Sequence, residues 1–302
     1  MSKIELNATG KILLEPGKLW SRIKTVTESA LKSGALLSIP TEYELVEQDG
    51  VIFIVRILSN LVRKDEAKKK QSKDFNPFLP YEQDLWVADI SDTHVCILNK
   101  FNIVDYHLLI ITRAFEEQDS LLTQQDFAAM WACLADIDGL AFYNSGKIAG
   151  ASQKHKHLQI VPLPLANTGV KVPIEALFGA EFTSVGKVPG LPFVHALTRF
   201  DLDLTKSPFD AGAATLERYQ TLLKAVGLEN KIGAYNLLVT REWMLMVGRS
   251  TEGVKLCLSR ECFESISVNS LGFAGALLVR NQEQLQLLKQ YGAMNILKSV
   301  GI

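Results

Sequence analysis

The chain has 302 residues, of which 47% are hydrophobic and 22% are charged, a balance typical of a globular protein that buries a large core. Its formal net charge of −1 excludes recruitment of nucleic acid or membrane by the field of the whole molecule. The amino terminus lacks the apolar core of a signal peptide, and the apolar run at residues 271–279 is too short to span a bilayer. We therefore expect a cytoplasmic protein without nucleic-acid or membrane partners.

Cysteine spacing gives no sign of a structural metal. The four cysteines are Cys96, Cys133, Cys257 and Cys262, and no two of them form a Cys-x-x-Cys pair. A zinc knuckle needs two closely spaced pairs, which this chain does not have. The pattern predicts buried free thiols in a reducing compartment.

The first segment predicts a helix followed by a hairpin. A helix is expected over residues 16–31, because a proline suits its first position and Gly34 suits its stop. Strands are expected over residues 43–47 and 51–58, since Asp49-Gly50 between two apolar runs is a strong hairpin signal.

Residues 63–76 are polar and rich in lysine and arginine. Such a segment is typical of a solvated loop, and it also fits a lid whose lysines meet a polyphosphate. Both interpretations stay open at this point.

The central part of the chain alternates strands and a helix. Strands are predicted over residues 85–89, 94–98, 107–112, 140–143 and 155–161. A capping box that begins at Thr123 and ends at Asp126 predicts a helix from there through Ala135. The prolines of residues 162–192 predict a long connection.

The second half predicts a similar mixture. A helix is expected over residues 214–226 and a single C-terminal helix over 283–297. The strands of this half are predicted over residues 234–240, 244–247, 266–268 and 276–279. A Tyr-Asn pair recurs as Tyr143-Asn144 and Tyr235-Asn236, which suggests a duplication without establishing one.

Two histidines and a glutamine, His155, His157 and Gln159, stand at alternate positions of one predicted strand. Alternate side chains of a strand share one face, so these three are expected to line up on one side of the sheet. The loop before them, residues 144–151, is rich in small residues and suits a phosphate. We interpret the pair of features as an imidazole nucleophile beside a phosphate cradle.

The chemistry of these residue types supports that interpretation. A neutral imidazole, with a free pKa of about 6.5, can attack phosphorus directly, and the charge on the phosphate then needs fixed donors. The candidate donors are the amides of Asn144 and Gln159, the Ser152 hydroxyl, and the backbone N–H groups of Gly150, Ala151, Ser152 and Gln153. Because an amide delivers no proton, the leaving group should need no strong acid, as is true of a polyphosphate.

The two histidines have two other interpretations. A His-x-His pair can bind metal, but a third ligand is missing nearby and glutamine is a poor zinc ligand. Two histidines on the solvent face of a strand can also be without function. The adjacent glycine-containing loop favours the catalytic interpretation.

With these residues, the chain resembles the transferase branch of the histidine-triad superfamily, and more narrowly the ATP adenylyltransferases, or diadenosine tetraphosphate phosphorylases. Besides the His-x-His-x-Gln motif, the resemblance rests on residues 76–80, 98–102, 107–112, 235–240, 243–244 and 269–275. It implies an α+β fold of two histidine-triad-like units, with antiparallel sheets and packed helices. Residues 1–165 would form the catalytic half and residues 166–302 the second half.

The resemblance also implies a mechanism. His157 would attack the α-phosphorus of diadenosine tetraphosphate, expel ATP and carry AMP until inorganic phosphate releases it as ADP. His155 would be an orienting partner, and Gln159 would hold the transferring phosphate. Further substrate contacts are implied at Lys64, Asn99, Lys100, Asn269 and Arg280, and Mg²⁺ is expected only together with the substrate.

Three other functions stay open. A nucleoside-diphosphate-sugar phosphorylase or uridylyltransferase of the same superfamily would use the same nucleophile. A dinucleotide hydrolase would use water in place of phosphate as the acceptor. A nucleotide-binding protein would keep the cradle without turnover, although the intact His155, His157 and Gln159 argue against it.

Overall fold

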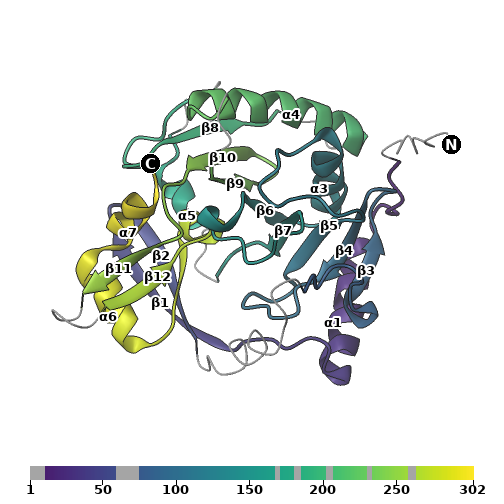
Figure 1. The fold of residues 1–302 in the computed structure, drawn as a ribbon, viewed down its shortest axis with the longest axis horizontal. Coiled ribbons are helices and arrows are strands. Elements are labelled where there is room, and N and C mark those ends of the chain that lie inside the picture. Colours follow the sequence, from purple (N-terminus) through teal and green to yellow (C-terminus); the bar gives the residue numbers. More distant parts are fainter. Residues whose placement is uncertain are drawn as a thin grey trace.

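A computed structural model describes residues 11–58, 75–166, 171–179, 185–201, 207–229, 233–257 and 263–302. Most of the lysine-rich segment predicted as a loop or lid, residues 63–74 with Lys64 among them, lies outside these residues. The fold mixes helices with antiparallel sheets, which confirms the predicted α+β class (Figure 1).

One large sheet organises the molecule. It has eight strands in the order β3-β4-β5-β7-β6-β9-β10-β8, and every neighbouring pair is antiparallel. The strands are β3 (Trp86–Asp89), β4 (His94–Leu98), β5 (Leu108–Thr112), β6 (Gly139–Asn144), β7 (His157–Pro162), β8 (His195–Arg199), β9 (Tyr235–Val239) and β10 (Trp243–Gly248).

Two smaller sheets and a set of helices complete the described chain. The first small sheet joins β1 (Thr41–Gln48), β2 (Val51–Leu58) and β13 (Ala276–Val279), and the second pairs β11 (Gly253–Cys257) with β12 (Phe263–Ser267). The α-helices are α1 (Leu19–Ser33), α3 (Gln124–Asp136), α4 (Pro208–Ala225), α5 (Ser270–Phe273), α6 (Gln282–Tyr291) and α7 (Ala293–Val300). Short 3₁₀ helices span Gln83–Leu85, Lys147–Ala149 and Pro173–Leu177.

The two faces of the large sheet pack against different layers (Figure 1). Leu158 and Ile160 of β7 join a hydrophobic core with Phe127 and Trp131 of α3. Val161, which points to the opposite face, joins a second core that includes the small sheet and α7. The odd-numbered residues of β7 therefore share the face away from α3, as the strand period predicts.

The large sheet runs without interruption through both halves of the sequence. β6 of the first half pairs with β9 of the second, and β13 extends the hairpin of β1 and β2 in parallel. The two Tyr-Asn pairs lie on these adjoining strands, with Asn144 opposite Asn236. The division at residue 165 into two histidine-triad-like units stays a prediction.

Two local signals are confirmed by the fold. Asp49 and Gly50 adopt φ angles of 50° and 77° and connect β1 to β2 as a two-residue hairpin loop. Thr123 and Asp126 exchange both hydrogen bonds of a capping box at the start of α3.

The start of the first helix was predicted wrongly. α1 begins at Leu19 rather than at residue 16, because Gly17 has a φ of 77° outside the helical region. The carboxylate of Asp136 accepts the N–H groups of Gly17 and Leu19 at 2.8 and 3.0 Å and so supplies the missing cap from α3. The predicted stop at Gly34, with a φ of 77°, is correct.

Three further predictions are corrected. The single C-terminal helix is two helices, α6 and α7, divided at Gly292 with a φ of 98°. α4 begins at Pro208, six residues before the predicted start. Strands β8 and β11 were not predicted.

Candidate active site

His157 is the first residue of β7, and both its backbone N–H and its ring form hydrogen bonds. Its Nδ1 lies 2.8 Å from the carbonyl oxygen of His155. A carbonyl only accepts, so Nδ1 carries the proton and Nε2 keeps its lone pair. The ring is 4% exposed and packs edge-on against Phe78. Among the described residues no hydrogen bond uses Nε2, so this atom has the character of a nucleophile.

Burial also sets the charge of His157. Loss of solvent lowers its pKa from 6.5 to about 4, against the raising effect of the bond to the His155 carbonyl. The imidazole is therefore neutral over the whole physiological range, as direct attack on phosphorus requires.

His155 lies just before β7, in an isolated bridge with Glu117, so the predicted strand start at residue 155 is two residues early. Both of its ring nitrogens are occupied. Nε2 donates to the carbonyl oxygen of Thr112 at 2.9 Å, and Nδ1 accepts from the Asn76 amide at 3.1 Å. The ring is buried and has no free nitrogen for chemistry, which fits an orienting partner.

Gln159 is oriented by a chain of side chains that reaches β4. Its Oε1 accepts from Nε2 of His107 at 3.0 Å, and Nδ1 of His107 accepts from the Asn99 amide at 3.3 Å. With Oε1 engaged, the Nε2 group of Gln159 has no hydrogen-bond partner in the part of the chain that the structure describes. It is free to donate on the face that His157 shares.

Asn144 ends β6 near His157. The β6–β7 register ends where Phe142 pairs with Gln159, two residues before Asn144 and two after His157. The amide of Gln118 spans the two strands there, donating to the carbonyls of Asn144 and His157 at 2.9 and 3.2 Å. Gln118 also accepts the His157 N–H at 2.8 Å.

The loop after Asn144 departs from its predicted donor set. The N–H groups of Gly150 and Ala151 donate within the loop, to Lys147 and Gly146, so they are not available to a phosphate. Gly150 serves the loop through its shape. Its φ is 92°, and an added Cβ would meet the Val268 carbonyl at 2.8 Å. Ser152, which is exposed, and Gln153, which is half-buried, follow as the remaining candidate donors.

The weaker substrate contacts are only partly brought together. Asn269 lies against Gly150, where its Oδ1 caps α5. Lys100 forms an ion pair with Glu82 at the protein surface. Arg280 is exposed after β13, and among the described residues no hydrogen bond or ion pair joins its guanidinium to the other predicted site residues.

Sequence reasoning missed Gln118, Asn76 and the orienting role of His107. Gln118 carries no motif signal, since it acts through backbone atoms of distant strands. Asn76 and His107 lie in segments that supported the family resemblance, which was the available signal.

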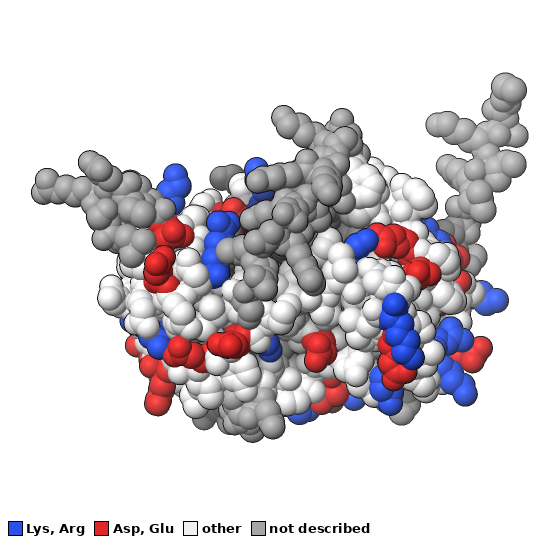
Figure 2. Space-filling view, turned by 90° about the horizontal axis from the view of Figure 1, so that it is seen from below, with Lys and Arg blue, Asp and Glu red and all other residues white. Residues whose placement is uncertain are grey.

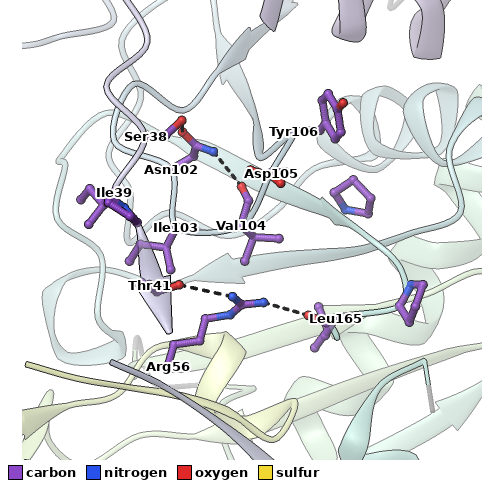
Figure 3. Close-up of a pocket in the computed structure, with 13 residues that line it drawn as sticks. Ser38, Ile39, Thr41, Arg56, Asn102, Ile103, Val104, Asp105, Tyr106 and Leu165 are labelled. Carbon is purple, nitrogen blue, oxygen red and sulfur yellow. Dashed lines mark hydrogen bonds between the residues drawn. The ribbon is translucent and has the colours of Figure 1, made fainter. Parts of the chain in front are cut away.

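A cavity of about 610 Å³ lies at the opposite end of β7 from His157 (Figure 3). Arg56 crosses it and donates to Oγ1 of Thr41 at 3.4 Å and to the Leu165 carbonyl at 2.9 Å. Asp105 and Tyr106 line it from the loop before β5. The predicted site residues do not line this cavity, which is separate from the His157 cluster.

On the face shown in Figure 2, basic and acidic side chains are interspersed. The described residues hold no group of three or more His, Cys, Asp or Glu side chains that could bind a metal. Within the same residues, no helix has the length and hydropathy needed to cross a membrane.

Comparison with known proteins identifies the family. A model described as the Ap4A phosphorylase N-terminal domain matches residues 9–180, more than half of the chain. The chain belongs to the Ap4A phosphorylase family. A second model, the ATP adenylyltransferase C-terminal domain, matches residues 189–302. The protein is therefore an enzyme, a nucleotidyltransferase, as the motif predicted.

Relatives of this family match most of the chain. Diadenosine 5',5'''-P1,P4-tetraphosphate phosphorylase 2 of Saccharomyces cerevisiae is 29% identical over 260 residues, 76% of this chain and 76% of the relative. Protein APA1 of the same yeast is 28% identical over 298 residues, 89% and 88% of the two chains.

A solved structure shares the fold. The crystal structure of yeast Ap4A phosphorylase Apa2 in complex with Ap4A superposes with a TM-score of 0.81 at 23% identity, covering 96% of this chain and 99% of that one. The architecture of Figure 1 is thus the fold of a member of the same family.

Proposed function

We propose that the enzyme cleaves diadenosine tetraphosphate by phosphorolysis, with His157 as the nucleophile that carries AMP. The observation that supports this proposal most directly is the hydrogen bonding of the His157 ring. Its Nδ1–H donates to the His155 carbonyl, while Nε2 has no partner among the described residues. Family membership and the yeast phosphorylases that match the chain support the substrate class.

In the first step Nε2 of His157 attacks the α-phosphorus and the P–O bond to the next phosphate breaks. ATP leaves with the bonding electron pair, and AMP stays on the ring as a phosphoramidate. In the second step an oxygen of inorganic phosphate attacks the same phosphorus, the P–N bond breaks, and ADP leaves. The imidazole then returns to its neutral form.

The other groups act by position and charge. The free amide of Gln159 and the amide of Asn144 would donate to the transferring phosphate, and His155 would hold the His157 tautomer through its carbonyl. A polyphosphate is a good leaving group that needs no strong acid. The amide of Gln159 can therefore occupy the position where a proton donor would otherwise be required. We propose that Mg²⁺ enters bound to the polyphosphate, because it keeps several waters and needs few protein ligands.

A cytoplasmic location is part of the proposal. It is supported by Cys96 and Cys133, which are buried free thiols of the kind that persist in a reducing compartment. Cell fractionation with an antibody against the chain would test it.

The deciding experiment follows products and protein mass together. With diadenosine tetraphosphate, ADP and ATP should form only when phosphate is present. Without phosphate, the intact protein should gain an acid-labile adduct of the mass of AMP. We expect His157→Ala to form no adduct and to lose turnover while keeping its fold. Lys154→Ala, which changes an exposed neighbour, should behave as the parent.

Each other outcome points elsewhere. AMP and ATP formed without phosphate would indicate a hydrolase. An adduct formed only from a nucleoside-diphosphate sugar would indicate a sugar-nucleotide transferase. Nucleotide binding that is unchanged in His157→Ala, with no reaction in either protein, would indicate a binding protein. Activity of His157→Ala within a few-fold of the parent would contradict the assigned nucleophile.

A further inference from the structure

Asn144 is held by the C-terminal half of the chain. Its side chain is 2% exposed, and Oδ1 accepts three hydrogen bonds. They come from Nδ2 of Asn236 at 2.8 Å, from the backbone N–H of Ser270 at 2.9 Å and from the Ser270 hydroxyl at 2.8 Å, whose one proton is shared with the Tyr143 carbonyl at 3.1 Å. All three donors lie more than ninety residues further along the sequence.

The donors are themselves fixed. Oδ1 of Asn236 accepts from the buried Arg249 guanidinium at 2.5 Å, and Nδ2 of Asn236 also donates to the carbonyl of Ala149, in the loop after β6, at 2.9 Å. Arg249 further donates to the Val268 carbonyl, just before α5, at 2.9 Å. The network therefore joins β9, α5 and the loop around one atom of Asn144.

Full engagement of Oδ1 decides where the rest of the amide points. An amide is planar, so three donors on Oδ1 fix the direction of Nδ2. Within the described chain no hydrogen bond uses Nδ2. Asn144 lies near His157, because Nε2 of Gln118 donates to the backbone carbonyls of both residues. Asn144 follows Phe142 by two positions and His157 precedes Gln159 by two, so the alternation of the paired strands puts both side chains on one face.

We infer that Ser270 and Asn236 are positioning residues for AMP transfer, which act by holding the Asn144 amide toward the phosphate that His157 attacks. The C-terminal half thereby contributes to the reaction without contacting the transferring phosphate. This inference rests on the proposed function of the His157 site.

Two observations separate this role from ordinary packing. The donors converge on one atom of a side chain whose other end is free beside the nucleophile, whereas a purely structural asparagine would have both ends bonded. The same Asn236 amide also donates to the loop that follows Asn144, so one group holds both Asn144 and that loop.

The test is a double-mutant cycle on adduct formation. Ser270→Ala removes the hydroxyl donor and leaves the backbone N–H in place. At saturating diadenosine tetraphosphate without phosphate, we expect it to slow formation of the AMP adduct about tenfold, within the range of coupling between contacting residues. Nucleotide affinity should stay within about twofold, since the lost contact matters when the phosphate transfers.

The second arm asks whether the effect passes through Asn144. Asn144→Ala should slow the adduct step by about 10²–10³, as for loss of one oxyanion donor. Adding Ser270→Ala to Asn144→Ala should then change the rate less than about twofold. Ser270→Thr, which keeps the hydroxyl, should restore most of the rate.

Controls keep the result interpretable. Ser250→Ala removes another hydroxyl of the C-terminal half, bonded to the carbonyls of Val300 and Gly301, and should leave the rate unchanged. If Ser270→Ala fails to fold, Asn236→Asp can be used instead. This change replaces the donating Nδ2 with an acceptor and keeps a partner for Arg249. It should slow adduct formation in the parent but not in the Asn144→Ala background.

Additive rates in the double variants, or a Ser270→Ala rate equal to the parent, would overturn the positioning role. Failure of the proposed function would look different, because the parent protein itself would then form no adduct with diadenosine tetraphosphate.

Discussion

The imidazole of His157 is prepared for attack by two local effects. Burial lowers its pKa to about 4, and the His155 carbonyl fixes the proton on Nδ1. Both effects keep Nε2 unprotonated, so in the proposed reaction His157 would need no separate base. The lowered pKa costs stability at acid pH. Below pH 6.5 the ring takes up a proton in the unfolded chain, whereas it stays neutral in the folded protein.

The depressed pKa predicts the pH profile of the first step. In phosphate-free buffer the rate of adduct formation should not fall as the pH passes through 6.5, and it should fall only toward pH 4 as the ring takes a proton. Quenched-flow measurement of adduct mass checks this.

A stability control belongs with that profile. Because the folded pKa of His157 lies below the unfolded one, stability is full above pH 6.5 and declines as the pH falls toward 4. Circular dichroism at each pH separates unfolding from loss of rate. A half-maximal rate near pH 6.5 in folded protein would show that the ring is not desolvated as the structure has it.

Gln159 supplies a second prediction at this scale. Gln159→Ala should slow AMP transfer by about 10²–10³, because one donor to the phosphate is lost. Gln159→Glu keeps the acceptor for His107 but presents a carboxylate to the phosphate, so it should be at least as slow. Stopped-flow or quench assays of adduct formation measure both. A Glu variant with the parental rate would mean that the free amide does not face the phosphate.

At the scale of the element, the segment that leads into β7 has side chains on two opposite faces. Lys156, which directly precedes β7 and stands between the two histidines of the candidate site, points away from them and is fully buried. Its Nζ donates to Asp126 at 2.8 Å, to Glu116 at 3.0 Å and to the Leu121 carbonyl at 3.0 Å. Asp126, whose pKa is held at about 2 by His94 and Lys156 despite its burial, also caps α3.

Removal of the Lys156 charge tests how much the buried Lys156–Asp126 ion pair stabilises the fold. Lys156→Met leaves Asp126 buried with one cation fewer, and breaking a buried pair costs about 3–5 kcal/mol. We expect the free energy of unfolding in urea to fall by roughly this amount. The matched change Lys154→Met, at an exposed position, should alter it by less than about 0.5 kcal/mol. Equal effects of the two variants would contradict the assignment.

Local signals predicted elements well where the cause is local. The Asp49-Gly50 hairpin and the Thr123 capping box depend on a few adjacent residues, and both are present. The start of α1 depends on the Asp136 carboxylate, more than a hundred residues away, so no local pattern marked it. The break at Gly292 lay inside an apolar periodicity that continues from α6 into α7.

At the scale of the whole molecule, the two halves of the sequence share one sheet and one core. β6 pairs with β9, β2 pairs with β13, and the second core contains residues of both halves. Separation of the halves would open sheet edges and expose apolar surface.

This arrangement predicts that residues 1–165 alone are inactive. The fragment would lose the donors that hold Asn144 and the partners of β6 and β2, so we expect neither a cooperative unfolding transition nor an AMP adduct. The same should hold for residues 1–180, the extent of the N-terminal family model. Calorimetry and intact mass provide the measurement. A fragment that melts cooperatively and forms the adduct would support independent units.

The sequence by itself determined the candidate nucleophile, which stays a proposal, and the strand period that His157 and Gln159 share, because a motif of adjacent residues carries them. It also determined the α+β class and the family resemblance. Tertiary structure decided which nitrogen of His157 is free, and that the Gly150 and Ala151 amides are engaged inside the loop. It also brought Gln118, Asn236 and Ser270 to the site. These facts arise from contacts between segments far apart in the chain, which no local pattern of residue types encodes.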